Sequence, residues 1–386
     1  MVFSKKLKDF LSLGTSQVFS SVLYGIFWLY LASILEKTDY GELGYFMSVA
    51  QVTSAISLLG LSNTIVVYEA KKEPIFPASF VLGLVSSVIA VIVTFFLFQN
   101  IFLSLLILGL NNFFLITNYI NSKKRFYDFS KYVLLRAILT VIAALIFYHI
   151  FGLDGIFMGY FLASLVILFE FRFVIKNKII EFSRLRPKLR FMIFSWTTRL
   201  TQVFFNWGDK LVVGTMFGFS ILGSFTFATQ YMLLLDALPR TIGHYLLPYE
   251  SEGSSNLKIK IFAIGIACII SAISILVVPY GVNFVLPQFT DAILPIQIMS
   301  IVIVPSTISM IKQSEFLGKE NSRVVLMGSL IQAGLYFVLI IILGEIYGLL
   351  GLAVGFLVSA TARTIFNLFV GYNRGNLKNS FEGENN

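Results

Sequence analysis

Long apolar runs alternate with short polar segments along the whole chain. A helix needs about 20 apolar residues to cross the hydrocarbon core of a bilayer. About twelve runs meet this requirement: 10–35, 43–66, 75–98, 100–121, 131–151, 153–176, 191–216, 221–247, 259–279, 291–312, 322–344 and 347–370. Because 57% of the residues are hydrophobic, 13% are charged and the mean hydropathy is +0.85, a soluble fold could not bury the apolar surface. The pattern predicts an all-α integral membrane protein with about 12 transmembrane helices.

Basic residues are concentrated in alternate loops. If the chain begins inside the cell, the inner loops hold nearly all the loop Lys and Arg, and the outer loops hold only Lys37. This asymmetry predicts a multi-pass protein of the cell membrane, plasma or inner, with both termini in the cytoplasm. The net charge of +9 therefore reflects topology, and we expect no nucleic-acid partner. The first span follows three lysines and is too long for a cleavable signal peptide, so we expect an uncleaved anchor.

The polar segment 177–190 divides the predicted spans into two halves. We expect an N-terminal six-helix bundle (1–176), a cytoplasmic linker (177–190), a C-terminal six-helix bundle (191–370) and a cytoplasmic tail (371–386), with a central cavity between the bundles. The proline-rich region 279–295 is a candidate for a broken helix. Short repeats relate the halves, since 43–46 and 68–70 resemble 222–225 and 249–251 at offsets of 179 and 181 residues. Such repeats around a central site are typical of secondary transporters.

Polar side chains form a stripe along each helix of the pair 191–216 and 221–247. Residues spaced three or four apart share one helix face. The first stripe comprises Arg199, Gln202, Asn206, Asp209 and Lys210, and the second comprises Asp236, Arg240 and His244. A charge in lipid costs at least a few kcal/mol, so the stripes indicate a cavity filled by water or substrate.

The charged side chains allow functional and structural interpretations. Arg199 lies about 12 Å inside its span by helical rise, so it either binds an anion or pairs with Asp209 or Asp236. Lys210 is either a second anion contact or a side chain that reaches the interface. Asp209 and Asp236 are candidate coupling-ion sites.

Other polar residues inside the spans have weaker claims to function. Arg240 is four residues from Asp236 and can form an intrahelical pair, whereas His244 is expected to be a packing residue. Arg363 and Asn367 form a shorter stripe on the last span. Arg136 on the fifth span is expected to reach the membrane interface. Three asparagines on the fourth span are expected to form interhelical hydrogen bonds: Asn111, Asn112 and Asn118.

Several kinds of chemistry lack a sequence signal. No phosphate-binding loop is present, so we expect no ATPase activity. With two histidines, one cysteine and no cluster of carboxylates, we expect no metal, no cofactor and no catalytic residue. Cys268 is expected to lie in the apolar core.

A family resemblance rests on two stretches. Asp39-Tyr40-Gly41-Glu42-Leu43-Gly44 resembles a turn of polysaccharide exporters. The stretch from Asp209-Lys210 through Gly214, Gly218, Leu222-Gly223, Phe225 and Ala228 resembles a second motif, as does the helix exit Pro248-Tyr249-Glu250-Ser251. The chain thus resembles the Wzx-like oligosaccharide flippases of the multidrug/oligosaccharidyl-lipid/polysaccharide exporter superfamily. Ser220 and Ser224 depart from the pattern of that family.

The resemblance implies a flippase and not an enzyme. It would move a polyprenyl-(pyro)phosphate-linked oligosaccharide from the cytoplasmic to the outer leaflet by alternating access, with Arg199, Arg240, Lys210, Arg363, Gln202 and Asn206 as substrate-binding candidates. Expected partners are this lipid-linked anionic oligosaccharide, the bilayer, a polysaccharide polymerase and glycosyltransferases, and we expect a monomer. One alternative is an ion-coupled multidrug antiporter of the same superfamily, which would need a net acidic cavity. Another is a membrane-embedded polysaccharide polymerase or ligase, which would carry a large outer loop.

Overall fold

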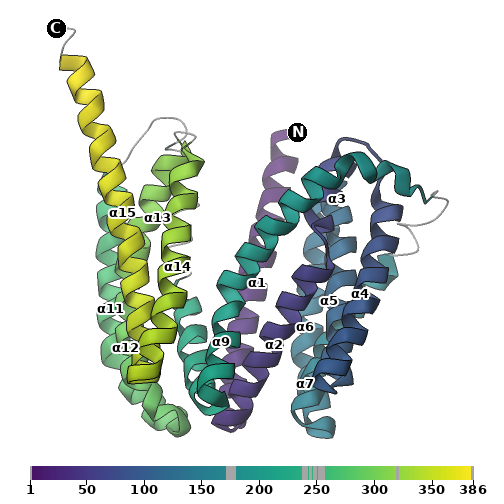
Figure 1. Cartoon of the computed structure of the whole chain (residues 1–386), viewed down its shortest axis with the longest axis horizontal. Coiled ribbons are helices and arrows are strands. Elements are labelled where there is room, and N and C mark those ends of the chain that lie inside the picture. Colours follow the sequence, from purple (N-terminus) through teal and green to yellow (C-terminus); the bar gives the residue numbers. More distant parts are fainter. Residues whose placement is uncertain are drawn as a thin grey trace. The chain divides into compact units, whose positions relative to one another are not determined.

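The computed structural model describes residues 2–170, 180–236, 257–318 and 321–383, with the single residues Ile242, Leu246 and Glu250. For 2–15, 17–18, 322 and 372–383 only the backbone is described. Within these ranges all regular secondary structure is helical (Figure 1). The helices of the first part are α1 (Val2–Ile34), α2 (Lys37–Ser57), α3 (Leu61–Ala70), α4 (Phe76–Phe98), α5 (Ile101–Ser122), α6 (Phe126–Phe151), α7 (Leu153–Ser164), η1 (Leu165–Ile167), η2 (Phe182–Arg184), η3 (Arg186–Lys188) and α9 (Leu189–Leu235). Those of the second are α11 (Leu257–Val285), η4 (Pro287–Ala292), α12 (Ile293–Ile301), α13 (Ile303–Gly318), α14 (Ser322–Tyr347) and α15 (Leu349–Gly383).

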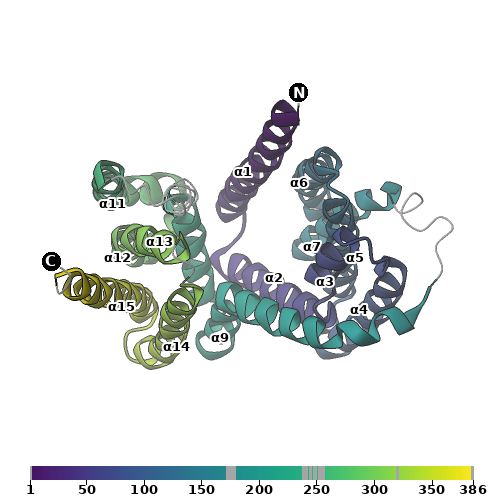
Figure 2. The same cartoon turned by 90° about the horizontal axis from the view of Figure 1, so that it is seen from above.

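The chain divides into two compact units. Unit 1 comprises Met1–Trp28 and Leu43–Leu211, and unit 2 comprises Leu29–Glu42 and Val212–Asn386. Unit 1 is built around α5, against which α3, α4 and α7 pack (Figure 2). Its core is a cluster that includes Leu61, Phe76, Leu115 and Ile120. The division into bundles at 1–176 and 191–370 stays a prediction.

The described residues contain nine helices that are long and apolar enough to cross a membrane, or ten if the bent pair α2–α3 is one span. Phe19–Ile34 is a further apolar helix that is too short to count. The predicted runs therefore correspond to the observed helices, and their limits differ in detail. α2 begins at Lys37, six residues before the apolar run, and α11 continues through Pro279 to Val285.

The third and fourth predicted spans are separated by a local turn at Gln99 and Asn100. Gln99 has a left-handed backbone (φ 53°), which ends α4 after Phe98. The Asn100 side chain accepts a hydrogen bond from the Leu103 backbone N–H at 2.9 Å and so caps α5. Two residues are therefore enough to reverse the chain here.

Gly218 forms the turn between the seventh and eighth predicted spans. Its φ of 81° and ψ of 169° interrupt the helical geometry inside α9, and a Cβ there would meet no atom within 4 Å. The Gly214-x-x-x-Gly218 spacing in the sequence predicts close helix packing, and for Gly218 that prediction is wrong. Its role is conformational, since this backbone region is essentially restricted to glycine.

Two helical hairpins repeat the same glycine pattern at an offset of 196 residues. Gly152 (φ 63°, ψ −140°) precedes α7, and Gly348 (φ 56°, ψ −134°) precedes α15. At Gly155 a Cβ would lie 1.9 Å from the Phe147 backbone oxygen, and at Gly351 it would lie 1.8 Å from that of Leu343. Each glycine therefore lets its helix pack directly on the backbone of the preceding one, as the Gly351-x-x-x-Gly355 spacing in the sequence predicts.

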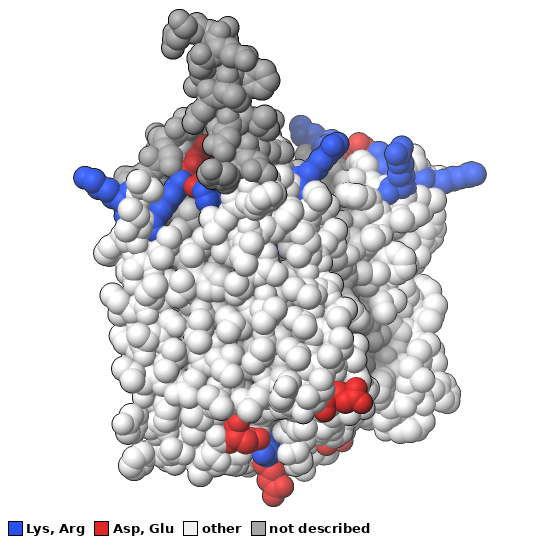
Figure 3. Space-filling view, turned by 60° about the vertical axis from the view of Figure 1, so that its left-hand side comes forward, with Lys and Arg blue, Asp and Glu red and all other residues white. Residues whose placement is uncertain are grey.

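Charged side chains gather at the ends of the helices. The space-filling view shows Lys and Arg at one end, Asp and Glu mainly at the other, and an uncharged belt between them (Figure 3). Such a belt matches a membrane-spanning segment. Cys268 is exposed on α11, so its expected place in the core is wrong. A lone thiol in an apolar run carries no information on which helix face is buried.

Candidate functional site

The site begins with a break in the second predicted span. α2 ends at Ser57 and α3 starts at Leu61, with a bend of 49° between them. Leu59 (φ 49°) and Gly60 (φ 74°) both have left-handed backbones, which a helix cannot contain. The break turns the start of α3 toward α5 and α9 and opens a space within unit 1.

This space is a cavity of about 340 Å³, lined entirely by unit 1. Its walls come from the α2–α3 break, α5, α6 and the first part of α9. The lining residues are Ala55, Leu58, Gly60, Ser62, Asn63, Phe113, Phe114, Thr117, Asn118, Phe129, Val133, Arg136, Ser195, Arg199 and Gln202. None of these described residues is acidic, so the cavity is formally cationic.

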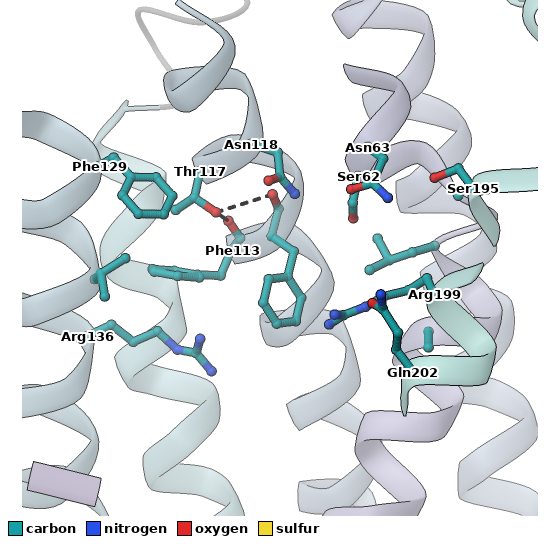
Figure 4. A pocket seen from close by; sticks show the side chains of 15 residues that line it. Ser62, Asn63, Phe113, Thr117, Asn118, Phe129, Arg136, Ser195, Arg199 and Gln202 are labelled. Carbon is teal, nitrogen blue, oxygen red and sulfur yellow. Dashed lines mark hydrogen bonds between the residues drawn. The ribbon is translucent and has the colours of Figure 1, made fainter. Parts of the chain in front are cut away.

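Two arginines supply the charge. Arg136 reaches in from α6 and Arg199 from α9, on opposite walls of the cavity (Figure 4). The Arg136 guanidinium carbon lies 4.4 Å from the Phe113 ring centroid, and that of Arg199 lies 5.8 Å from the Phe114 centroid. Such contacts hold a guanidinium over an aromatic face and leave its N–H groups free for a ligand.

Neither arginine is neutralised by a carboxylate in the described part of the chain. The ion pairs of this part do not include Arg136 or Arg199. Nε of Arg136 is buried and has no hydrogen-bond partner among the described residues. Both arginines are partly buried. A cation inside a membrane span without a counter-ion is costly, so a group that brings negative charge would be stabilised here.

Neutral polar groups surround the two cations. Asn63, Asn118 and Gln202 offer amide groups, and Ser62 and Ser195 offer hydroxyls. Figure 4 shows Asn63 and Ser62 near Ser195, and Asn118 near Thr117, whose hydroxyl donates to the Phe113 backbone oxygen at 2.6 Å. A mainly apolar and aromatic lining with a few polar groups is typical of a ligand pocket, in which the polar groups fix the orientation of the ligand.

The first predicted stripe divides between the cavity and other positions. Arg199 and Gln202 line the cavity, as the shared face of their helix required. Asn206 is exposed, and its amide donates to the Gln202 backbone oxygen at 2.7 Å. Asp209 and Lys210 are buried, with 3.5 Å between Lys210 Nζ and Asp209 Oδ1. The Lys210 ammonium lies 5.4 Å from the Trp207 ring centroid.

In unit 2, the described part of the second stripe is Asp236. It interacts electrostatically with Arg363, whose Nη1 donates to Gln332 Oε1 at 2.9 Å. Asn367 is fully buried and donates to Ser309 at 2.8 Å. Arg240 and His244 lie outside the described residues. The substrate and coupling roles of this set stay predictions.

A buried carboxylate marks the end of α3. Glu69 is 3% exposed and accepts hydrogen bonds from the backbone N–H groups of Ile75 (2.8 Å) and Phe76 (2.7 Å). Lys123 Nζ lies 2.7 Å from its other oxygen. Glu69 therefore caps α4 and ties it to α3 and α5, which fixes two helices that line the cavity.

A second charged cluster at this end of unit 1 is centred on Arg125. Arg125 bonds Glu170 and Asp128, each at 2.7 Å. Burial disfavours its charge, but the two carboxylates outweigh this effect and raise the pKa of Arg125 above its ordinary value. Arg125 thus stays charged and links the turn after α5 to α6 and to Glu170, which follows η1.

Comparison with known proteins assigns the chain to a family. A family model described as a polysaccharide biosynthesis protein matches residues 30–288. The chain belongs to this family. The family assignment predicted from the sequence motifs is confirmed. No curated protein sequence matches the chain.

Solved membrane transporters share its fold. The structure of a lipid II flippase, MurJ, in an inward closed conformation has a TM-score of 0.75 at 14% identity, covering 93% of this chain and 87% of MurJ. An inward-facing multidrug resistance MATE family transporter of the MOP superfamily has a TM-score of 0.64 at 18% identity, covering 92% and 94%. A MOP superfamily transporter from Pyrococcus furiosus has a TM-score of 0.52 at 15% identity, covering 95% and 93%. This polysaccharide biosynthesis protein therefore shares the fold of these transporters, and the predicted all-α membrane fold is confirmed.

Sequence reasoning missed part of the cavity. Arg136 was expected to reach the interface, but it points into the cavity instead (Figure 4). Asn118 also lines the cavity, whereas Asn111 forms the expected interhelical bonds, to Ser54, Ser57 and Ser87. Asn63 and Ser62 gave no signal, because the helix break that places them lies at Leu59-Gly60, a pair that occurs in many continuous helices.

Proposed function

We propose that this polysaccharide biosynthesis protein is a flippase for a polyprenyl-(pyro)phosphate-linked oligosaccharide. It moves the head group from the cytoplasmic to the outer leaflet by alternating access, for surface polysaccharide or glycoconjugate synthesis. The observation that carries the proposal is the cavity with two arginines and no acidic lining residue. A phosphate or diphosphate supplies the missing negative charge, and guanidinium groups bind it through paired N–H donors.

The neutral lining suits the sugar next to the phosphate. Asn63, Asn118 and Gln202 can exchange hydrogen bonds with sugar hydroxyls, while Phe114 and Phe129 offer apolar faces. The lipid tail stays in the bilayer, where the helices expose large apolar side chains. The head group alone then needs a polar path.

The similar solved structures favour transport over catalysis. MurJ is a lipid II flippase and the MATE proteins are transporters, which supports a carrier and gives no support to a polymerase or ligase. An ion-coupled multidrug antiporter is the second candidate, favoured by the MATE-like fold. Its organic cations would be repelled by Arg136 and Arg199, so we rank it below the flippase.

Other polar residues of the spans and the partners of the protein also belong to the proposed transport cycle. Arg240, Arg363, Lys210 and Asn206 contribute further substrate contacts, and Asp209 and Asp236 serve as coupling-ion sites. The protein acts as a monomer in the cell membrane with both termini in the cytoplasm. It receives substrate made by glycosyltransferases and delivers it to a polysaccharide polymerase.

The test is export by Arg199→Ala. We expect the variant to insert normally and to lose export of the glycan, because the cavity keeps only one cation. Arg190→Ala is the matched control, since Arg190 is an exposed arginine on the same helix outside the cavity. Full export by Arg199→Ala, measured as surface polysaccharide per inserted protein, would contradict the assigned role.

A further inference from the structure

The α2–α3 break leaves two backbone carbonyls without their helical partners. In a continuous helix the oxygens of Ile56 and Ser57 would accept from the N–H groups four residues later. Here the Ile56 oxygen accepts from the Leu59 backbone N–H at 3.4 Å and, more closely, from the Trp196 indole Nε1 at 3.0 Å, and the Ser86 hydroxyl donates to the Ser57 oxygen at 2.6 Å. Side chains of α9 and α4 thus replace the missing helical bonds.

The same point is a close approach between backbones. A Cβ on Gly60 would lie 2.2 Å from the Met192 backbone oxygen and 2.8 Å from the Trp196 backbone nitrogen. The break therefore rests directly on one turn of α9. From that turn Trp196 donates its hydrogen bond to the end of α2, and the neighbouring Ser195 lines the cavity.

The break also determines what α3 presents to the cavity. Ser62 and Asn63 lie in the first turn of α3, immediately after Gly60, and both line the cavity. Arg199 lies one turn after Ser195 on α9. A bond from Trp196 to the last turn of α2 thus connects the wall that carries Arg199 to the wall that carries Asn63.

The internal repeat places a second helix-breaking residue at the corresponding position. The two halves are related at offsets of 179 and 181 residues on either side of this point, so Pro239 corresponds in sequence to a residue between Leu58 and Gly60. Proline disfavours an uninterrupted helix. The sequence thus favours a break in both halves, through different residues.

We propose that Trp196 is a positioning residue of the cavity: its bond to the Ile56 carbonyl fixes the α2–α3 break and thereby holds Asn63 and Ser62 toward the arginines. The role in substrate recognition rests on the proposed function, but the geometric claim does not. Trp196 itself is absent from the cavity lining, so its effect passes through α3.

The test measures the position of Asn63 without any substrate. In a C268A background, which removes the one cysteine, the variants N63C and N118C are each labelled with the sulfonate-bearing thiol reagent MTSES. Asn118 is the matched reporter, because it lines the same cavity from α5, away from the break. W196F keeps an aromatic ring and removes the N–H donor, and W207F is the control tryptophan on the same helix.

We expect W196F to slow labelling of N63C at least threefold and to leave N118C unchanged, while W207F changes neither rate. S86A, which removes the other carbonyl bond, should slow N63C in the same direction. Unchanged labelling of N63C in W196F would overturn the proposal. An equal change at N118C would also overturn it, since Trp196 would then support the fold in general. The proposed function is tested independently by glycan export. Full export by Arg199→Ala would contradict the flippase role, while the expected labelling rates of N63C and N118C would still support the role of Trp196.

Discussion

Gly60→Ala tests whether the close approach at the α2–α3 break is as tight as the structure requires. The new methyl group would lie 2.2 Å from the Met192 backbone oxygen, well inside ordinary contact distance, and both neighbours are backbone atoms that cannot rotate away. The left-handed backbone of this position (φ 74°) adds a conformational cost. A left-handed non-glycine residue costs about 1–2 kcal/mol and overpacking about 1–3 kcal/mol. Together they predict a loss of about 2–5 kcal/mol in the free energy of unfolding.

The assay is thermal unfolding of the purified protein in detergent. Gly334→Ala is the matched control, because Gly334 lies inside α14, has an ordinary helical backbone, and a Cβ there would meet no atom within 4 Å. Alanine is the better helix former, so the control should be neutral or slightly stabilising. We expect a lower melting temperature for Gly60→Ala alone. Equal melting temperatures for Gly60→Ala and the wild type would refute the close approach.

Two further predictions concern charged groups. Glu69→Ala should lower the free energy of unfolding by about 3 kcal/mol, because it orphans two backbone N–H groups and Lys123. Glu181→Ala is the control, because Glu181 pairs with Arg184 at the surface and its removal should lower the free energy of unfolding by at most about 1 kcal/mol. Both variants are measured by chemical denaturation in detergent, and equal losses of stability in Glu69→Ala and Glu181→Ala would contradict the capping role of Glu69. Asp236→Asn should change the dependence of transport on an imposed ion gradient in proteoliposomes; transport that ignores both the substitution and ionophores would argue against a coupled carrier.

Much of the fold could be predicted because membrane insertion constrains the sequence strongly. The apolar runs and the basic loops identified the spans, since a backbone that crosses lipid must satisfy its own hydrogen bonds and apolar runs of about 20 residues do so as helices. The predicted helix limits were less accurate, because an apolar run marks only the part of a helix inside the hydrocarbon core and helices can extend beyond it. α2 thus starts at Lys37, where Asp39 in its first turn favours the helix dipole.

The glycine hairpins show a signal that the sequence did contain. Gly152, Gly155 and Gly159 recur as Gly348, Gly351 and Gly355, with matching turn geometry in the structure. Two helical hairpins with the same spacing are stronger evidence for a repeat than the short matches of 43–46 and 68–70 to 222–225 and 249–251.

The cavity could be predicted only from α9. Arg199 and Gln202 share a face with other polar residues, so periodicity singled them out. Arg136 is an isolated cation in α6, and one residue does not tell which side of its helix faces inward. Asn63 and Ser62 depend on a break set by tertiary bonds from Trp196 and Ser86, which no local pattern reports.

The most direct test of the central claim is binding of an anionic polyprenyl head group to the two cavity arginines. Binding of geranylgeranyl diphosphate and of the uncharged alcohol geranylgeraniol to the purified protein can be compared by microscale thermophoresis. We predict that the wild type prefers the diphosphate by about 10-fold or more, which corresponds to one charge-assisted contact. The double variant Arg136→Gln with Arg199→Gln should lose that preference. A wild type without the preference, or a double variant that retains it, would contradict the account.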